Sequence, residues 1–337
     1  MSMELPELRL QWMAEPLRSI IRRGILDLLV IFALPRRTEA GVQRRSTAIW
    51  LLGAAAALFD VIWIRSSDFQ FPAAPAVYGL SFMALIAIVC SLVRTHFHIQ
   101  TPVVLIETLV QCTFASIALV LATYLIASLT TPWADPWLAR ADRLLGFDWV
   151  AVNRAAAGHE WLTNILRPAY YSFHTQPVAI IWILAFQRSH RPVQLFVLSW
   201  VIALAISVAL YAGAPAMTAY NYFAKTHASL PDLSAAMGNF AFDQISSLRA
   251  GGSRDLLALK LGGLVTFPSF HTTGGILFMW ALWPLRWLRW PSVALNVVML
   301  ASVPIIGSHY LIDMIAGVIV AFIAIKLSLI VDRVCGK

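Results

Sequence analysis

Long apolar runs, separated by short polar segments, make up most of the chain. Eight of these runs approach the length of about 20 apolar residues that a helix needs to cross a bilayer. They lie near residues 46–64, 73–93, 102–129, 166–187, 193–213, 264–285, 291–306 and 309–331. The pattern therefore predicts an all-α membrane protein with about eight transmembrane helices.

The composition agrees with this fold class. Of the 337 residues, 59% are hydrophobic and 12% are charged. A soluble domain carries about a quarter charged residues, so a soluble class is excluded. Residues 1–17 are polar and do not resemble a cleaved signal peptide. The three cysteines are scattered and indicate neither a disulfide framework nor a metal site.

An apolar stretch at residues 15–34 precedes the first run and is interrupted by charges. It is too broken to span a bilayer, and we expect an amphipathic helix on the membrane surface. Four arginines follow within residues 36–45. If that cluster is cytoplasmic, every other short basic loop is cytoplasmic under the eight-span count. Those loops carry Arg94, Arg188, Arg191, Arg286, Arg289, Arg333 and Lys337.

The same orientation places two long segments, residues 130–165 and 214–263, outside. Aromatic residues among charges in residues 131–160 suggest an interfacial helix or a plain connecting loop with aromatic anchors. The net charge of +8 reflects the bias of the cytoplasmic loops, and we expect no nucleic-acid partner.

Two histidines and an aspartate lie at the starts of the sixth and eighth apolar runs. His309 and Asp313 are four residues apart, so on a helix they would share one face. A carboxylate in that position can hold a histidine in one tautomer and stabilise its cation. With His271, they make three ionisable residues in membrane segments, which indicates a functional site. Each one alone could also be a satisfied core residue.

The sequences around these residues resemble a known family. Residues 267–271 read Phe-Pro-Ser-Phe-His, and residues 309–313 read His-Tyr-Leu-Ile-Asp. This ordered pair resembles the second and third signature motifs of the type-2 phosphatidic acid phosphatase superfamily. It is closest to the inositol phosphorylceramide synthase-like branch, whose Ala-Pro segment residues 211–217 also resemble.

The resemblance covers roughly residues 102–331, and it implies that the last six runs form the superfamily's helical bundle there. Residues 46–101 would be two accessory transmembrane helices. Residues 1–45 would be a cytoplasmic N-terminal segment, and residues 332–337 a cytoplasmic tail. We expect an integral multi-pass protein of a bacterial inner membrane with its site facing the periplasm, or a Golgi-type lumen in a eukaryote.

The resemblance also implies a reaction without a metal ion or other cofactor. His309 would attack phosphorus to give a phosphohistidine, Asp313 would orient it, and His271 would act as acid and then base. The branch favours transfer of a phosphoinositol-like headgroup from a phospholipid to a hydroxyl lipid such as ceramide. Water as the acceptor would make the protein a lipid phosphate phosphatase, and a non-enzymatic lipid-binding or transport protein is the third alternative. Membrane lipids are the expected partners, and the oligomeric state stays open.

Two cations of the wider superfamily pattern are missing. Arg167 and Pro168 match its Arg-Pro pair, but Glu160 occupies the position of the preceding Lys. Val303 stands where the third motif has an Arg. Cations of residues 214–263 are candidates to replace them, although each can also be merely solvated. They are Lys225, Arg249, Arg254 and Lys260, of which we expect Arg254 or Lys260 because they lie closest to the sixth run.

Further contacts to substrate are expected at two helices. Ser269 and Thr272, with backbone N–H groups at a helix start, could bind phosphate oxygens, and Pro268 at the first helical position would leave those donors free. The spacing of Arg167, Tyr171 and His174 puts these side chains on one helix face. That face could line a headgroup pocket, or its residues could be interfacial anchors.

Overall fold

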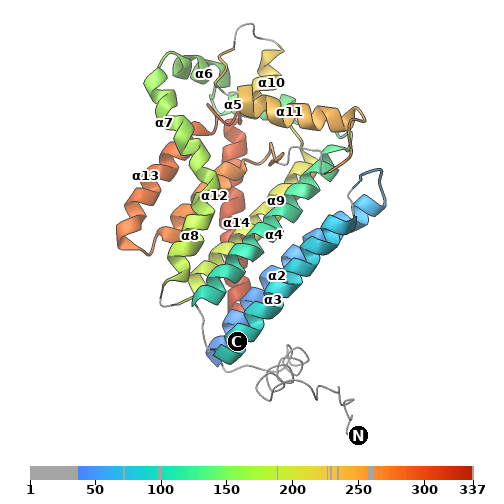
Figure 1. The fold of residues 1–337 in the computed structure, drawn as a ribbon. Coiled ribbons are helices and arrows are strands. Elements are labelled where there is room, and N and C mark those ends of the chain that lie inside the picture. Colours follow the sequence, from blue (N-terminus) through green and yellow to red (C-terminus); the bar gives the residue numbers. More distant parts are fainter. Residues whose placement is uncertain are drawn as a thin grey trace.

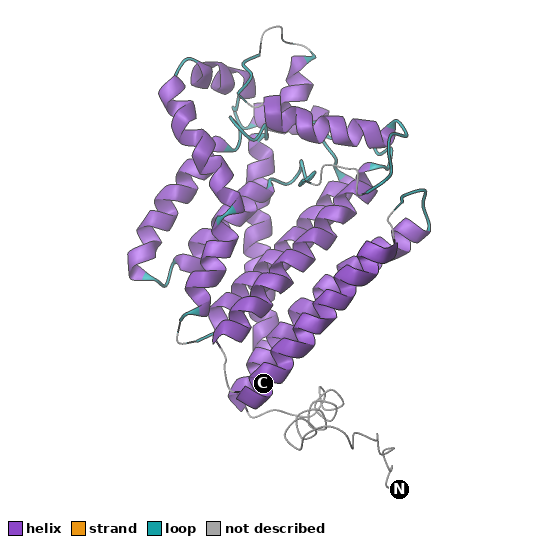
Figure 2. Ribbon diagram, in the orientation of Figure 1, coloured by secondary structure: helices purple, strands orange, loops and turns teal. Residues whose placement is uncertain are grey.

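The structure is a computed structural model that describes residues 37–70, 73–97, 101–187, 189–225, 227, 230–233, 235–256 and 262–335. These residues form helices joined by short loops, and no β-strand occurs among them apart from one isolated bridge (Figure 2). The amphipathic helix expected at residues 15–34 and the candidate Lys260 lie outside the described residues.

Thirteen α-helices and one 3₁₀ helix follow one another among the described residues, with the labels of Figure 1. They are α2 (Arg37–Arg65), α3 (Ala73–Phe97), α4 (Thr101–Ala127), α5 (Asp135–Leu144), α6 (Trp149–Ala157), α7 (Glu160–Tyr171), the 3₁₀ helix η1 (Ser172–His174), α8 (Gln176–Ala185), α9 (Arg191–Gly213), α10 (Ala219–Ala224), α11 (Ala235–Arg249), α12 (Phe270–Leu282), α13 (Arg286–Ser302) and α14 (Leu311–Cys335).

Four helices among the described residues are long and apolar enough to cross a membrane. They are Gly41–Arg65, Thr101–Ala127, Arg191–Gly213 and Leu311–Cys335. The other predicted runs coincide with helices that are shorter, less uniformly apolar or interrupted, namely α3, α7 with α8, α12 and α13. The described residues thus support a helical membrane protein with four candidate spans.

The run predicted at residues 166–187 is not one helix. It is divided between α7 and α8 by the 3₁₀ turn η1. Pro177, in the first turn of α8, has no N–H for the carbonyl of Phe173, and its ring excludes a regular helix through that carbonyl. Phe173 and His174 therefore lie in the 3₁₀ turn and not in the α-helix that carries Tyr171.

The core of the bundle surrounds α9, which packs against α4 and α14 (Figure 1). Large side chains from these helices, such as Phe196, Leu125 and Val320, are fully buried in one apolar cluster. α2 packs along α4 on the outer side of this core. The bundle therefore has a continuous apolar interior around α9.

One end of the bundle is held by an ion cluster around the buried carboxylate of Asp332. Asp332 of α14 binds Arg45 of α2 at 2.9 Å and Arg191 of α9 at 2.6 Å. The Arg45 Nε also donates to Gln194 at 2.8 Å. Since breaking a buried pair leaves a charge without a counter-ion, this cluster fixes the three helices relative to one another.

The opposite end is covered by the shorter helices α5, α6, α10 and α11 (Figure 1). The segment for which a helix or a plain loop was expected thus contains α5 and α6. Pro136 lies in the first turn of α5, and Gly146 supplies a positive φ of 74° in the turn to α6. Asp148 then caps α6 by accepting from the Ala151 N–H at 3.0 Å.

Candidate active site

His309 and Asp313 are in direct contact at the covered end of the bundle. The Nδ1 of His309 lies 3.2 Å from Oδ2 of Asp313, and both side chains are buried. The same oxygen accepts the Tyr310 N–H at 3.0 Å. The expectation that both residues lie on one helix was wrong for His309, because α14 begins at Leu311 and Ser308 has a positive φ of 61°. The loop brings His309 back over the first turn, which carries Asp313.

The sixth run begins as a helix only at Phe270, and residues 264–269 are not helical. Ser269 is the N-cap, and its hydroxyl accepts from the N–H of Thr272 at 3.4 Å. Pro268 precedes the cap, so the expectation that it occupies the first helical position was wrong. Ser269 and Thr272 are buried and do not line the cavity described below, and their expected contact with phosphate stays a prediction.

The ring of His271 is held between two aromatic rings. Its centroid lies 4.2 Å from that of Tyr170, nearly parallel at 12°, and 4.2 Å from that of Phe173. His174 stands edge-on at 6.2 Å. The Nε2 of His271 is buried and has no hydrogen-bond partner, so it is available to a bound molecule.

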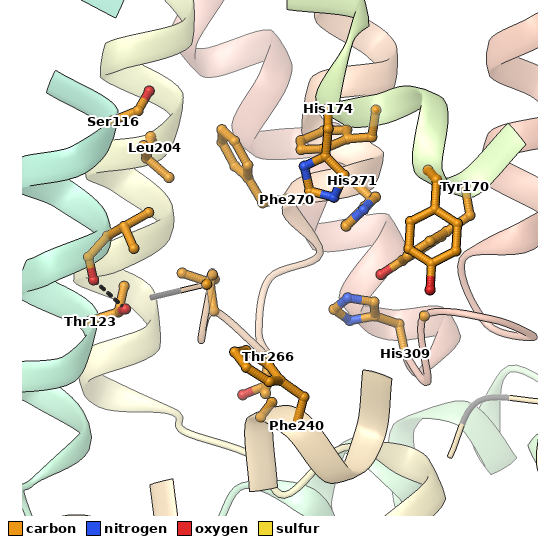
Figure 3. A pocket seen from close by; sticks show the side chains of 18 of the residues that line it. Ser116, Thr123, Tyr170, His174, Leu204, Phe240, Thr266, Phe270, His271 and His309 are labelled. Atoms are coloured by element: carbon orange, nitrogen blue, oxygen red, sulfur yellow. Dashed lines mark hydrogen bonds between the residues drawn. The ribbon is translucent and has the colours of Figure 1, made fainter. Parts of the chain in front are cut away.

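His271 and His309 open onto one cavity of about 610 Å³ (Figure 3). Its histidine end is completed by His174, Tyr170 and Tyr171 from α7 and η1. The remainder extends toward α4 and α9 and is mainly apolar. It is lined there by Ser116, Ile117, Val120, Thr123, Trp200, Leu204, Phe240, Val265 and Phe270. The cavity therefore joins a polar end to a space suited to a hydrocarbon chain.

The structure separates the expected cations from this cavity. Arg167 is exposed and is not among the lining residues. Arg254 pairs with Asp68 at 3.6 Å, in the connection after α2. The guanidinium of Arg249 lies over the Trp133 ring at 3.9 Å. No described Lys or Arg lines the cavity, and of the helix face predicted from spacing only Tyr171 and His174 reach it.

Lys225 is also engaged elsewhere, since its Nζ lies 3.0 Å from the sulfur of Met217. Within the part of the chain that the structure describes, no group of three His, Cys, Asp or Glu side chains is placed to hold a metal ion.

Sequence reasoning named no carboxylate of the outer segment, yet Asp135 and Asp142 of α5 are buried beside the His309 loop. Burial raises the pKa of both carboxyls above the ordinary value of 3.8, and the hydrogen bonds that they accept oppose that shift. The sequence does contain a signal for these two residues. Both are acidic residues in the segment 131–160, where an interfacial helix was expected.

A helical membrane protein with a buried His–Asp pair and a second histidine on one partly apolar cavity is suited to chemistry on a lipid headgroup. Residues 136–327 match the family model of the PAP2 superfamily, and the chain belongs to that superfamily. This membership supports a phosphatase or phosphotransferase that acts on lipid phosphates. The match runs from α5 to α14 and leaves out α4, which we had expected to belong to the core.

Neither a search of curated proteins nor one of solved structures returned a match to the chain. The superfamily match and the geometry of the site together indicate the function of the protein.

Proposed function

We propose that the protein is a phosphotransferase of the inositol phosphorylceramide synthase-like branch. It moves a phosphorylated headgroup, phosphoinositol-like, from a phospholipid to a hydroxyl lipid such as ceramide. The observation that carries this proposal is the contact of His309 with Asp313 beside His271, at the polar end of a cavity that continues between apolar helices. Membership of the superfamily supports the lipid phosphate chemistry.

In the first half-reaction the Nε2 of His309 attacks phosphorus while Asp313 holds Nδ1 and stabilises the positive ring. A P–N bond forms, and the P–O bond to the diacylglycerol oxygen breaks. His271 gives a proton to that departing oxygen. The unpartnered Nε2 of His271 supports this role, because it is free to contact a reacting oxygen.

In the second half-reaction the acceptor hydroxyl loses its proton to His271, and its oxygen attacks the phosphohistidine. The P–N bond breaks, and His309 is regenerated. No step requires a metal ion or a cofactor. When the donor is a lipid phosphomonoester and water takes the place of the hydroxyl lipid, the same steps release inorganic phosphate, and the protein is a lipid phosphate phosphatase, which is the second candidate function.

The charge of the phosphate is met by His174, Tyr171 and backbone N–H groups around the start of α12 in this proposal. His174 and Tyr171 line the cavity at its histidine end. Arg254 is not part of this proposed phosphate contact, because its side chain pairs with Asp68.

The proposed topology has eight spans, with the last six as the catalytic core and the site on the periplasmic or lumenal side. Two observations support it. Arg45 and Arg191, which the positive-inside rule places in the cytoplasm, meet at one end of the bundle. The His309 loop lies near the other end, under α5 and α10 (Figure 1).

The test supplies purified protein with either labelled phosphatidylinositol and ceramide or labelled phosphatidic acid alone, in detergent micelles without divalent metal. We expect labelled phosphoinositol on ceramide to form faster than phosphate is released. Release without transfer would favour the phosphatase. His309→Ala should abolish both products and the acid-labile phosphoenzyme of the wild type. If His309→Ala keeps near wild-type turnover, His309 is not the nucleophile. If the wild type binds lipid without turnover, the protein is a lipid-binding protein and not an enzyme.

A further inference from the structure

The loop that carries His309 is held from outside the bundle by α5 and α6. Four side chains of this helix pair contact residues 304–312, and each of them is buried. They are Asp135, Asp142, Trp149 and Asn153. Residues 304–312 immediately surround His309, so these contacts bear directly on its position.

Asp142 makes the closest connection to the His–Asp pair. Its Oδ2 accepts the N–H of Leu311 and its Oδ1 accepts the N–H of Ile312, both at 2.9 Å. These are the first two residues of α14, whose N–H groups have no partner within their own helix. A carboxylate at this place also meets the positive end of the helix dipole. Asp142 therefore caps α14 from another helix. The two residues that it caps lie between His309 and Asp313 in the sequence.

The other contacts bracket the same loop. The Oδ1 of Asp135 accepts the Tyr310 hydroxyl at 2.9 Å, and its Oδ2 accepts the N–H of Met217 at 2.7 Å. On the far side, Trp149 Nε1 and Asn153 Nδ2 donate to the carbonyl of Pro304 at 3.0 and 3.3 Å. The loop is thus tied both before and after His309.

We infer that Asp142 of α5 is a positioning residue that sets the His309 ring against Asp313. The inference rests on the proposed function for its catalytic meaning. A nucleophile in a loop with a positive φ beside it has no helix to hold it in place. A displacement of about 1 Å from a change outside the reacting atoms can lower a rate about 100-fold. The cap by Asp142 prevents such a displacement.

The test compares Asp142→Ala and Asp142→Asn with Asp148→Ala as the matched control. Asp148 is also an N-cap of this outer segment, but it caps its own helix and is exposed. Turnover is measured with phosphatidylinositol and ceramide in micelles. In Asp142→Ala we expect kcat to fall at least about tenfold with KM within about twofold of wild type. Asp142→Asn keeps one acceptor oxygen, so its kcat should lie between those of Asp142→Ala and the wild type. The kcat of Asp148→Ala should equal that of the wild type.

A second measurement does not depend on turnover. Diethyl pyrocarbonate modifies histidines, and mass spectrometry of peptides reports each one separately. His309 is shielded in the wild type and should react at least about threefold faster in Asp142→Ala. Exposed His159 serves as the internal reference for reagent and folding.

The outcomes separate this inference from the proposed function. A wild type without turnover would refute the function, and the modification rates would still decide the role of Asp142. Equal His309 reactivity in Asp142→Ala and Asp148→Ala would overturn the inference, as would a loss confined to KM. If Asp142→Ala does not fold, Asp142→Asn decides by the same two readouts.

Discussion

The backbone N–H of Ser269 donates to the carbonyl oxygen of Asp313 at 3.0 Å. This bond joins the N-cap of α12 to the first turn of α14. The hydroxyl of Thr273 adds a second link, since it donates to the carbonyl of Gly317 at 3.0 Å. The two sequence motifs therefore form one structural unit, in which the packing of α12 against α14 sets the position of Asp313 relative to the start of α12.

Gly317 of α14 lies close against the start of α12. A Cβ added there would lie 2.5 Å from the carbonyl oxygen of Ser269 and 3.0 Å from the Cβ of Thr272. We expect Gly317→Ala to cost about 1–3 kcal/mol of stability through overpacking. It should also lower kcat about tenfold or more, because the two helices must separate. Thermal unfolding and headgroup transfer measure the two effects.

The control for that substitution is Gly79→Ala in α3, where a Cβ would meet nothing within 4 Å. Its activity should equal that of the wild type, and its stability should be equal or higher by up to about 1 kcal/mol, because alanine favours a helix over glycine. A Gly317→Ala protein with wild-type kcat would show that the spacing of α12 and α14 does not limit the reaction.

The ion cluster at the other end of the bundle should affect stability but not chemistry. Asp332→Ala leaves Arg45 buried without its counter-ion, and such a loss costs about 3–5 kcal/mol. We expect a lower unfolding temperature in detergent and, for protein that stays folded, a kcat within about twofold of wild type. Arg333→Ala, next in sequence and exposed, is the control and should change neither quantity. An unchanged unfolding temperature in Asp332→Ala would contradict the proposed importance of the cluster.

Each predicted apolar run overlaps helical residues, because a membrane interior requires continuous apolar length and the residue pattern records it, but the run at 166–187 is divided between α7 and α8. The contact of His309 with Asp313 agrees with the prediction, although His309 lies in the loop before α14 and not on the helix that the spacing argument assumed. The positive φ at Ser308 could not be predicted, since hydrophobic periodicity reports burial and not the path of a loop. For the same reason the pattern did not reveal that Asp142 caps α14.

The case of Arg254 shows a second limit. It is close to the sixth run in sequence, but the backbone of residues 254–256 pairs with Gln70, in the connection after α2. The N–H of Gln70 donates to the carbonyl of Arg254 at 2.9 Å, and the carbonyl of Gln70 accepts the N–H of Leu256 at 3.0 Å. Arg254 is therefore near His271 in the sequence but does not line the cavity. Long-range backbone pairing of this kind leaves no signature in composition or charge.

The orientation of the bundle can be tested by labelling. In a protein whose native cysteines are replaced, Ser253→Cys and Ser189→Cys are both exposed positions at opposite ends of the proposed topology. A membrane-impermeant maleimide added to intact cells should label the first and should reach the second only after permeabilisation. Labelling of both from one side would contradict the eight-span arrangement and the outward-facing site.

The last prediction concerns the charge that meets the phosphate. His174 stands edge-on to His271 at 6.2 Å and lines the cavity, whereas Arg254 is paired with Asp68. An interaction with developing charge is worth about 10²–10³ in rate. We expect His174→Gln to lower kcat/KM at least about tenfold, while Arg254→Gln keeps more than about half, which is less than about 1 kcal/mol. His159→Gln, an exposed histidine outside the cavity, is the control. If kcat/KM falls more in Arg254→Gln than in His174→Gln, the phosphate is held by Arg254 and not by His174.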